Sequence, residues 1–322
     1  MADLDTANIY DLVRQHYSSA SRSTSVKYGE AVAKSFGYSA EELASIPQDS
    51  NLGLSCGNPL VIASLKEGET VIDLGSGAGF DVFLAATKIG PSGRAIGIDM
   101  NDDMLARANK IKSTRPGPQT ENITFLKGNI TAVPLPPATA DCIISNCVIN
   151  LVPGADKPLV FREMHRLLKK GGRVAVSDIL AKKALPETLR ADMAMYVGCI
   201  AGASEVCEYE AWLTEAGFSD VMIVDTGADL NVYLETSEDG QRKDGCCAPA
   251  ATDPVSTDAN SKSCVPAAGD GCCGPDTVAA ASIACSSAGS GAAAPATATG
   301  GGCPVPAGMA LKKTDLNEFV GK

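Results

Sequence analysis

The 322-residue sequence lacks the features that mark several large classes of protein. It contains no apolar run of about 18 residues, the length of a membrane-spanning helix, and its start, MADLDTANIYDL, has no basic stretch before an apolar one. No cluster of lysine and arginine is interleaved with aromatic residues, and the formal net charge is -11. We therefore expect a cytoplasmic protein that binds neither membranes nor nucleic acid.

Histidine and regularly spaced metal-ligand pairs are also scarce. The chain has only 2 histidines and no CxxC pair among its 12 cysteines, so a structured zinc site is not expected. So many cysteines are typical of disulfide scaffolds in small secreted chains, whereas a cytoplasmic protein keeps its thiols reduced. Metal binding or catalysis is the better interpretation of these cysteines.

Composition divides the chain into a globular part and a low-complexity part. The hydrophobic fraction of 45% is ample for a core, but residues 236–310 are mostly Ala, Gly, Pro, Ser and Thr with scattered cysteines. Such a segment cannot bury a core, and its cysteines either scavenge soft ions or belong to a passive linker. We predict an N-terminal helical cap at 1–66, the main domain at 67–235, a cysteine-rich linker at 236–310 and a terminal strand remnant at 311–322.

One stretch, VIDLGSGAG at 71–79, predicts both a fold and a ligand class. Its apolar start is typical of a buried parallel strand. Gly75, Gly77 and Gly79 then alternate before a segment with helical spacing, Phe80–Ile89. Strand, glycine turn and helix form the nucleotide crevice of doubly wound sheets, where glycine lets the backbone turn tightly and approach a ligand.

The spacing of this motif differs from the GxGxxG of dinucleotide-binding proteins. The pattern here is DxGxGxG, and it resembles the first motif of the class I S-adenosylmethionine-dependent methyltransferases, which implies that cofactor. An acid at Asp99 would hold both ribose hydroxyls, Asn129 and Ile130 would bracket the adenine, and Tyr28 either packs in the core or covers the cofactor. The predicted cofactor-binding set is Tyr28, Asp73, Gly75, Ser76, Gly77, Gly79, Asp99, Met100, Asn129 and Ile130.

Alternating strand and helix patterns continue to residue 225. Strands are predicted at 71–74, 95–99, 123–127, 141–146, 173–178 and 221–225. This alternation requires an α/β fold with a doubly wound, mostly parallel sheet and helices on both faces. We expect this Rossmann-like sheet to follow N-terminal helices and to precede a disordered cysteine-rich segment. Only Leu316–Val320 offers a seventh strand, which is therefore short, late or absent.

Three cysteines stand out by their positions. Cys56 lies in a glycine-punctuated loop before the nucleotide motif, Cys147 directly follows a strand, and Cys199 ends a helical segment. The fold directs two of these positions toward the cofactor crevice, and a flexible loop can bring in the third. Three converging thiolates would form a soft, trigonal site for a thiophilic ion. Any one alone is better explained as a small buried apolar residue, the role we assign to Cys142 and Cys207.

The sequence contexts of these cysteines resemble one known family. SCGNP around Cys56, DLGSGAGFD at the glycine turn, SNCVINL around Cys147 and VGCIAGA around Cys199 are similar to the arsenite methyltransferases, over roughly residues 25–235. The resemblance implies methyl transfer from S-adenosylmethionine to trivalent arsenic, a detoxification reaction, with these three cysteines as catalytic arsenic ligands. It also implies an external thiol reductant, glutathione or thioredoxin. We expect the protein to be a monomer.

Other interpretations stay open at this point. Many family members carry a further cysteine upstream of the first arsenic ligand, but residues 1–55 contain none, so the resemblance does not extend to a thiol relay at that position. With a different acceptor, the same fold would suit a small-molecule O- or C-methyltransferase. A protein that only sequesters heavy metals through its cysteine tail is the remaining alternative.

Overall fold

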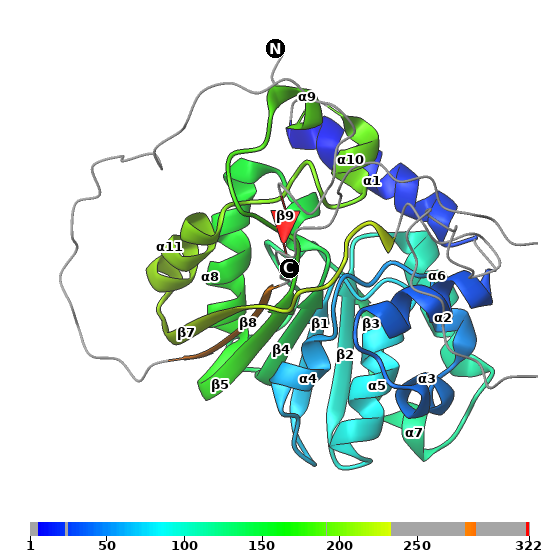
Figure 1. The fold of residues 1–322 in the computed structure, drawn as a ribbon. Helices are drawn as coiled ribbons and strands as arrows, with labels where there is room; N and C mark the ends of the chain where they lie inside the picture. Colours follow the sequence, from blue (N-terminus) through cyan, green and yellow to red (C-terminus); the bar gives the residue numbers. More distant parts are fainter. Residues whose placement is uncertain (1–5, 23–24, 191, 233–280, 288–319, 322) are drawn as a thin grey trace, which may run out of the picture.

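The computed structural model describes residues 6–22, 25–190, 192–232, 281–287 and 320–321. The strands of its main sheet are β1 (Thr70–Leu74), β2 (Arg94–Asp99), β3 (Ile123–Lys127), β4 (Ala140–Asn146), β5 (Leu168–Ser177), β7 (Phe218–Asp225) and β8 (Ala281–Ser287). Their order across the sheet is β3-β2-β1-β4-β5-β8-β7 (Figure 1). The helices are α1 (Thr6–Ala20), α2 (Val26–Ser35), α3 (Ala40–Ser45), α4 (Pro59–Ala63), α5 (Phe80–Ile89), α6 (Asp102–Ser113), α7 (Pro118–Glu121), α8 (Lys157–Leu167), α9 (Glu187–Arg190), α10 (Met193–Val197) and α11 (Val206–Ala216).

The central strand β1 shows why the sheet is parallel and buried. It pairs in parallel with β2 on one side and with β4 on the other. Ile72 and Leu74 belong to one apolar core and Val71 to a second one, because successive side chains of a strand point to opposite faces. A strand covered on both faces reads as a continuous apolar run, and the predicted doubly wound, mostly parallel fold is confirmed.

Helices cover each of these two faces (Figure 1). On one face, α8 and α11 bury Phe161 and Tyr209, whose rings meet edge to face with centroids 5.2 Å apart. On the other, α5 buries Phe83 and Ile89, and α6 buries Met104. None of the helices in the described part combines the length and apolar character that a bilayer crossing requires.

The strand of the main sheet that comes last along the chain, β8, lies where a linker was predicted. β8 falls inside 236–310, lies between β5 and β7 and runs antiparallel to both. Its sequence, ASIACSS, is mostly alanine, serine and cysteine, and alanine is depleted in strands, so composition did not reveal it. The predicted terminal strand also differs. Of that segment the structure describes Val320, which with Gly321 forms β9 and pairs with β6 (Leu180–Ala181) in a separate sheet.

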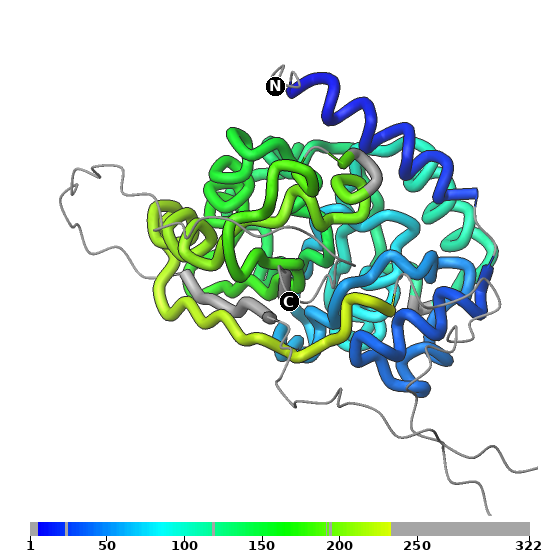
Figure 2. Tube along the Cα trace, turned by 45° about the horizontal axis from the view of Figure 1, so that its top comes forward, coloured from blue at the N-terminus to red at the C-terminus, as the bar shows by residue number. Residues whose placement is uncertain are grey.

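The first helix lies along the edge of the molecule, and the segment after β7 runs across it toward the α2 region (Figure 2). The side-chain amide of Asn101, at the start of α6, donates to the Arg14 carbonyl of α1 at 2.9 Å. At the other end of the described part, Val232 packs with Val32 and Phe36 of the α2 region. The predicted cap at 1–66 therefore contacts the sheet domain through specific residues on both sides.

We predict that β8 is needed for stability. A chain ending at residue 235 lacks it, whereas a chain ending at residue 290 retains it. Without β8, β5 and β7 lose the strand between them and leave backbone groups unpaired, so the shorter chain should melt lower by roughly 10 °C or more. Thermal melting followed by circular dichroism checks this. Equal melting of both truncations and the full chain would show that β8 contributes nothing.

Candidate active site

The loop between β1 and α5 follows a left-handed path that its glycines allow. Gly75, Gly77 and Gly79 have φ angles of 79°, 52° and 90°, a region that glycine adopts at little cost. A Cβ atom at Gly75 would collide with the side chain of Val148. Asp99, at the end of β2, fixes the middle of the loop, since its Oδ2 accepts the Gly77 N–H at 2.8 Å.

Three carboxylates surround this loop. Burial raises the pKa of Asp73, Asp81 and Asp99, and the charges of Asp81 and Asp99 raise the pKa of Asp73 further. Tyr38 donates to Asp81 Oδ1 at 2.6 Å and Asn146 to its Oδ2 at 2.9 Å. These bonds favour the charged form, yet burial still raises the pKa of Asp81 to about 6. Because buried carboxylates that share a site repel one another, a cationic group among them is favoured.

These acids line a pocket of about 1040 Å³, counted with the solvent at its mouth. Eight of the predicted cofactor residues are in its wall: Asp73, Gly75, Ser76, Gly77, Asp99, Met100, Asn129 and Ile130. Gly79 is not; it is the N-cap of α5, and a Cβ atom there would meet the rings of Phe125 and Phe83. Tyr28 is not in the wall either. It belongs to α2 rather than to a loop, and its ring packs over Gly53.

The sequence analysis missed one wall of the pocket. Helix α1 contributes Tyr10, Val13, Arg14 and Tyr17, and the Tyr10 hydroxyl donates to Asp156 Oδ2 at 3.0 Å. The sequence predicted an N-terminal helical cap at 1–66, but not what its first helix would meet. Only the docking of α1 across the chain shows that it faces a ligand pocket.

Of the three cysteines singled out by the sequence, Cys56 and Cys147 come together beside this pocket, and Cys199 reaches the backbone of Cys147. Cys56, Cys147 and Cys199 belong to one buried cluster, and Cys147 also lines the pocket. Cys56 and Cys147 are joined by a disulfide with their Cα atoms 5.5 Å apart, which corrects the expectation that these thiols are reduced. The Cys199 thiol donates to the Cys147 carbonyl at 2.9 Å.

Two of these cysteines have an unusual backbone. Cys147 has a φ of 59° and Cys199 a φ of 65°. This left-handed region is costly for a residue with a Cβ, and it persists only where surrounding contacts enforce it. Such strain concentrates at functional sites, so the backbone independently supports a role for both residues.

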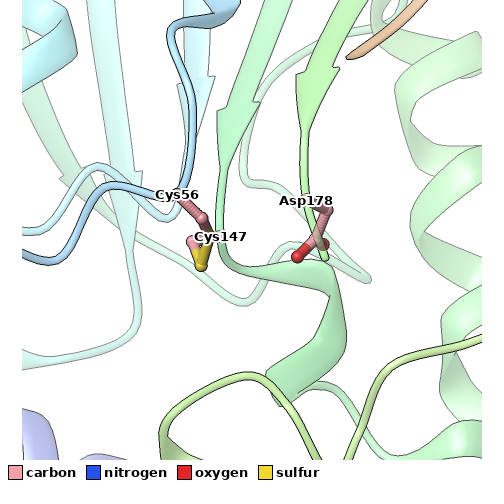
Figure 3. A group of neighbouring side chains, drawn as sticks. All are labelled: Cys56, Cys147 and Asp178. Carbon is pink, nitrogen blue, oxygen red and sulfur yellow. A yellow bond between two sulfur atoms is a disulfide. The ribbon is translucent and has the colours of Figure 1, made fainter. Parts of the chain in front are cut away.

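A buried carboxylate stands next to the disulfide (Figure 3). The carboxylate of Asp178 and the sulfurs of Cys56 and Cys147 all lie within 4.8 Å of one another. Burial raises the pKa of Asp178 to about 6, although hydrogen bonds and the nearby Lys157 ammonium favour its charged form. Tyr209 donates to Asp178 Oδ2 at 3.0 Å. The thiol cluster is thus buried next to an acid, and a further negative charge there would be unfavourable.

The remaining cysteines have other surroundings. Cys142 is completely buried in the sheet core, and burial raises the pKa of its thiol to about 12, in keeping with its assignment as a packing residue. Cys207 is exposed on α11, so its assignment as a buried packing residue is wrong. Cys285 lies in β8, and the other tail cysteines lie outside the described residues, so ion scavenging by the tail stays a prediction.

A comparison with family models finds a match to a methyltransferase domain at residues 65–217. With the parallel sheet and the left-handed glycine loop at its carboxyl edge, this match defines the class of the protein as a class I methyltransferase domain.

Relatives narrow this class. The chain is 41% identical to the arsenite methyltransferase of Halobacterium salinarum over 219 residues, which cover 64% of this chain and 55% of that protein. It is 34% identical to the arsenite methyltransferase of Homo sapiens over 175 residues, 52% of this chain and 46% of that protein. The chain belongs to the arsenite methyltransferase family, and it spans about half the length of these curated relatives.

A solved structure gives a further likeness. It is CrArsM, an arsenic (III) S-adenosylmethionine methyltransferase from Chlamydomonas reinhardtii, 30% identical to this chain. The match covers 63% of this chain and 68% of that one, with a TM-score of 0.48.

We predict that Asp81 makes stability depend on pH between about 4 and 6. Its pKa is about 6 in the folded chain, whereas an unfolded Asp titrates near ~3.9. In this range the folded state binds more protons than the unfolded state, so the free energy of unfolding falls as the pH rises.

Asp81→Asn should reduce this fall by up to about 3 kcal/mol, at 1.36 kcal/mol per pKa unit. Urea denaturation at a series of pH values measures it. Asp103→Asn, at an exposed position of α6, is the matched control and should leave the profile unchanged. The same profile in Asp81→Asn and the unsubstituted chain would contradict the assignment.

Proposed function

We propose that this chain transfers a methyl group from S-adenosylmethionine to trivalent arsenic held by the thiolates of Cys56, Cys147 and Cys199. The observation that carries the proposal is the position of Cys147, which lines the pocket and belongs to the same buried cluster as the other two cysteines. A methyl donor in the pocket and an ion on the thiols would therefore be neighbours. Relatives named arsenite methyltransferases support the same acceptor.

The pocket residues suit S-adenosylmethionine, which carries a sulfonium, an α-ammonium and no phosphate. Carboxylates at Asp73 and Asp81 would offset its positive charges, and that gain would lower their raised pKa values. Asp99 would accept the ribose hydroxyls, and Asn129 and Ile130, which also line the pocket, would bracket the adenine. When bound, the cofactor supplies an electrophilic methyl group.

Charge favours trivalent arsenic over a divalent ion at the thiols. Arsenite exchanges its As–O bonds for As–S bonds, and the thiol protons leave with the hydroxides as water. The resulting complex with three thiolates carries no net charge. A divalent metal with the same ligands would carry a negative charge, which the burial of the cluster and the neighbouring Asp178 disfavour.

The transfer itself needs no general base. Arsenic bound to three thiolates keeps a lone pair, which can form the As–C bond while the methyl–sulfonium bond breaks and a neutral thioether leaves. The product is a pentavalent arsenic cation that carries the methyl group and three sulfurs. Attack of an external thiol on one of these sulfurs would form a disulfide, release a proton and return methylated trivalent arsenic on two thiolates. The task of the protein is then positioning, which can supply much of the barrier reduction. The left-handed conformations of Cys147 and Cys199 fit such a fixed arrangement.

The disulfide implies a reductant. While Cys56 and Cys147 are joined, neither sulfur can bind arsenic. A dithiol of the thioredoxin class, or two molecules of glutathione, would break the S–S bond by thiol exchange, so that each cysteine regains a proton and the reductant becomes a disulfide. We propose that such an external thiol opens the site before arsenite binds.

Asp99→Ala should weaken binding of S-adenosylmethionine. The loss should be roughly 1.5–3 kcal/mol for each charge-assisted hydrogen bond to a ribose hydroxyl that disappears. Isothermal titration calorimetry on the reduced full chain measures it. Asp103→Ala removes an exposed carboxylate from the first turn of α6 and serves as the matched control. Unchanged affinity in Asp99→Ala would place the ribose elsewhere.

The need for each cysteine should change between the first and second methylation. Arsenite can use all three thiolates, whereas a monomethylated trivalent arsenical has only two valences left for sulfur. We expect Cys56 to be the dispensable one, because it lies in an irregular loop, whereas Cys147 and Cys199 adjoin regular elements. Cys56→Ser should therefore lose arsenite methylation and keep the second transfer, and Cys147→Ser and Cys199→Ser should lose both.

To test these variants, each is incubated with labelled S-adenosylmethionine, glutathione and either arsenite or monomethylarsonous acid. Speciation of the labelled products then shows which of the two transfers each variant performs. Cys207→Ser, on the exposed face of α11, is the control. If Cys56→Ser alone abolishes both steps, or no cysteine matters, the trithiolate scheme is wrong. Methylation of organic acceptors without need for the cysteines would favour a small-molecule methyltransferase, and arsenic binding without transfer would favour sequestration.

A further inference from the structure

Two asparagines flank Cys147 in the turn that follows β4. Asn146 is the last residue of β4, and Asn150 lies in the 3-10 turn η2 (Ile149–Leu151). Neither residue was among the predicted site residues, because an amide at a strand end has no distinctive sequence pattern. In the structure, each amide bonds to the segment of a different cysteine.

Asn146 holds the loop that carries Cys56. Its Oδ1 accepts the Cys56 backbone N–H at 3.2 Å, and its Nδ2 donates to the Gly57 carbonyl at 3.0 Å. The same Nδ2 also lies 2.9 Å from Asp81 Oδ2 and 2.9 Å from the Tyr38 hydroxyl, so its two hydrogens are shared among three acceptors. Backbone groups on both sides of the Cys56 side chain are therefore bound by one amide, which is itself anchored to the pocket wall.

Asn150 holds the backbone of Cys199. It is fully buried, and its Nδ2 donates to the Cys199 carbonyl at 3.2 Å and to Asp178 Oδ1 at 2.9 Å. The Cys199 thiol in turn donates to the Cys147 carbonyl at 2.9 Å. These bonds fix the position of a residue whose left-handed backbone is otherwise costly.

We propose that Asn146 and Asn150 are positioning residues that set the three cysteines against one another, Asn146 through the Cys56 loop and Asn150 through the Cys199 backbone. Cys147, between them, is held by the sheet, since its N–H donates to the Ser177 carbonyl of β5 at 2.8 Å. One turn at the end of β4 thus determines where all three sulfurs lie. The inference rests on the proposed function and names the residues that build its thiol site.

Loss of each asparagine should affect a different thiol, and this can be measured without arsenic. In Asn146→Ala, the reduced full chain treated with oxidised glutathione should close the Cys56–Cys147 disulfide about tenfold more slowly, because the loop is no longer held near Cys147. In Asn150→Ala, that rate should stay within about twofold, while alkylation of Cys199 by iodoacetamide should rise about tenfold. Peptide mass spectrometry assigns both reactions to their cysteines.

The two variants should also differ in methylation. Because Asn146 acts through Cys56, Asn146→Ala should lower the ratio of the arsenite rate to the monomethylarsonous acid rate by about tenfold. Asn150→Ala should lower both rates together and leave the ratio unchanged, since Cys199 is needed for both steps. Asn146 also lines the cofactor pocket, so Asn146→Ala can slow both transfers by weakening cofactor binding. Because the ratio compares the two rates of one variant, such a common loss cancels.

Asn122→Ala is the matched control. The Asn122 amide likewise joins distant segments, donating to the Gly90 carbonyl at 2.8 Å, but it contacts none of the cysteine segments and should change neither thiol reaction. Thermal melting checks folding, and Asn150→Ser, which retains a short polar side chain, replaces Asn150→Ala if that variant does not fold.

Disulfide closure at the unsubstituted rate in Asn146→Ala, or unchanged Cys199 alkylation in the folded Asn150 variant, would overturn the inference. Failure of the proposed function would look different: the cysteine variants would methylate arsenite normally while the two thiol reactions still changed as expected.

Discussion

Parallel pairing of β1 with β2 and with β4 is the constraint on which the rest of the structure depends. Parallel strands end at the same edge of a sheet, so Asp73, Asp99 and Cys147 come from three separate strands or strand ends and still meet around one pocket. The helices that cover the two faces leave this edge accessible to loops and to α1. Binding groups therefore gather at the carboxyl ends of the strands, where open α/β sheets bind their ligands.

Burial gives the two halves of the site opposite electrostatic preferences. On the cofactor side, Asp73, Asp81 and Asp99 are held close together in a poorly solvated wall, which raises their pKa values and favours a positively charged ligand. On the thiol side, the sulfurs of Cys56 and Cys147 lie beside the buried Asp178, which favours a complex of low net charge. A sulfonium donor and a neutral metalloid acceptor meet these two preferences together.

Positioning of the thiols depends on hydrogen bonds rather than on packing alone. Cys56 lies in an irregular loop, and Cys147 and Cys199 both have left-handed backbones, so none of the three is held by regular secondary structure at its own position. The amides of Asn146 and Asn150 and the backbone of β5 provide the missing restraints. A buried amide with several partners is a rigid connection because each bond would be costly to leave unmade.

The sequence by itself determined the class of fold, the glycine loop and eight residues of the pocket wall. These features depend on local patterns: apolar runs of strand length, glycines where φ must be positive, and an acid at a strand end. It also identified the three cysteines, through their immediate neighbours. Local patterns did not reveal β8, whose residues have weak strand preference and which forms a strand between two partners from distant parts of the chain.

Tertiary structure alone decided the α1 wall, the position of Tyr28 away from the pocket, the Cys56–Cys147 disulfide and the roles of Asn146 and Asn150. Each of these depends on which residues become neighbours after folding. The disulfide joins positions 91 residues apart, and the Asn150 amide reaches a carbonyl 49 residues along the chain. Such contacts carry no signature in the local sequence, because a side chain has the same chemistry wherever it lies, and only its folded surroundings determine what it binds.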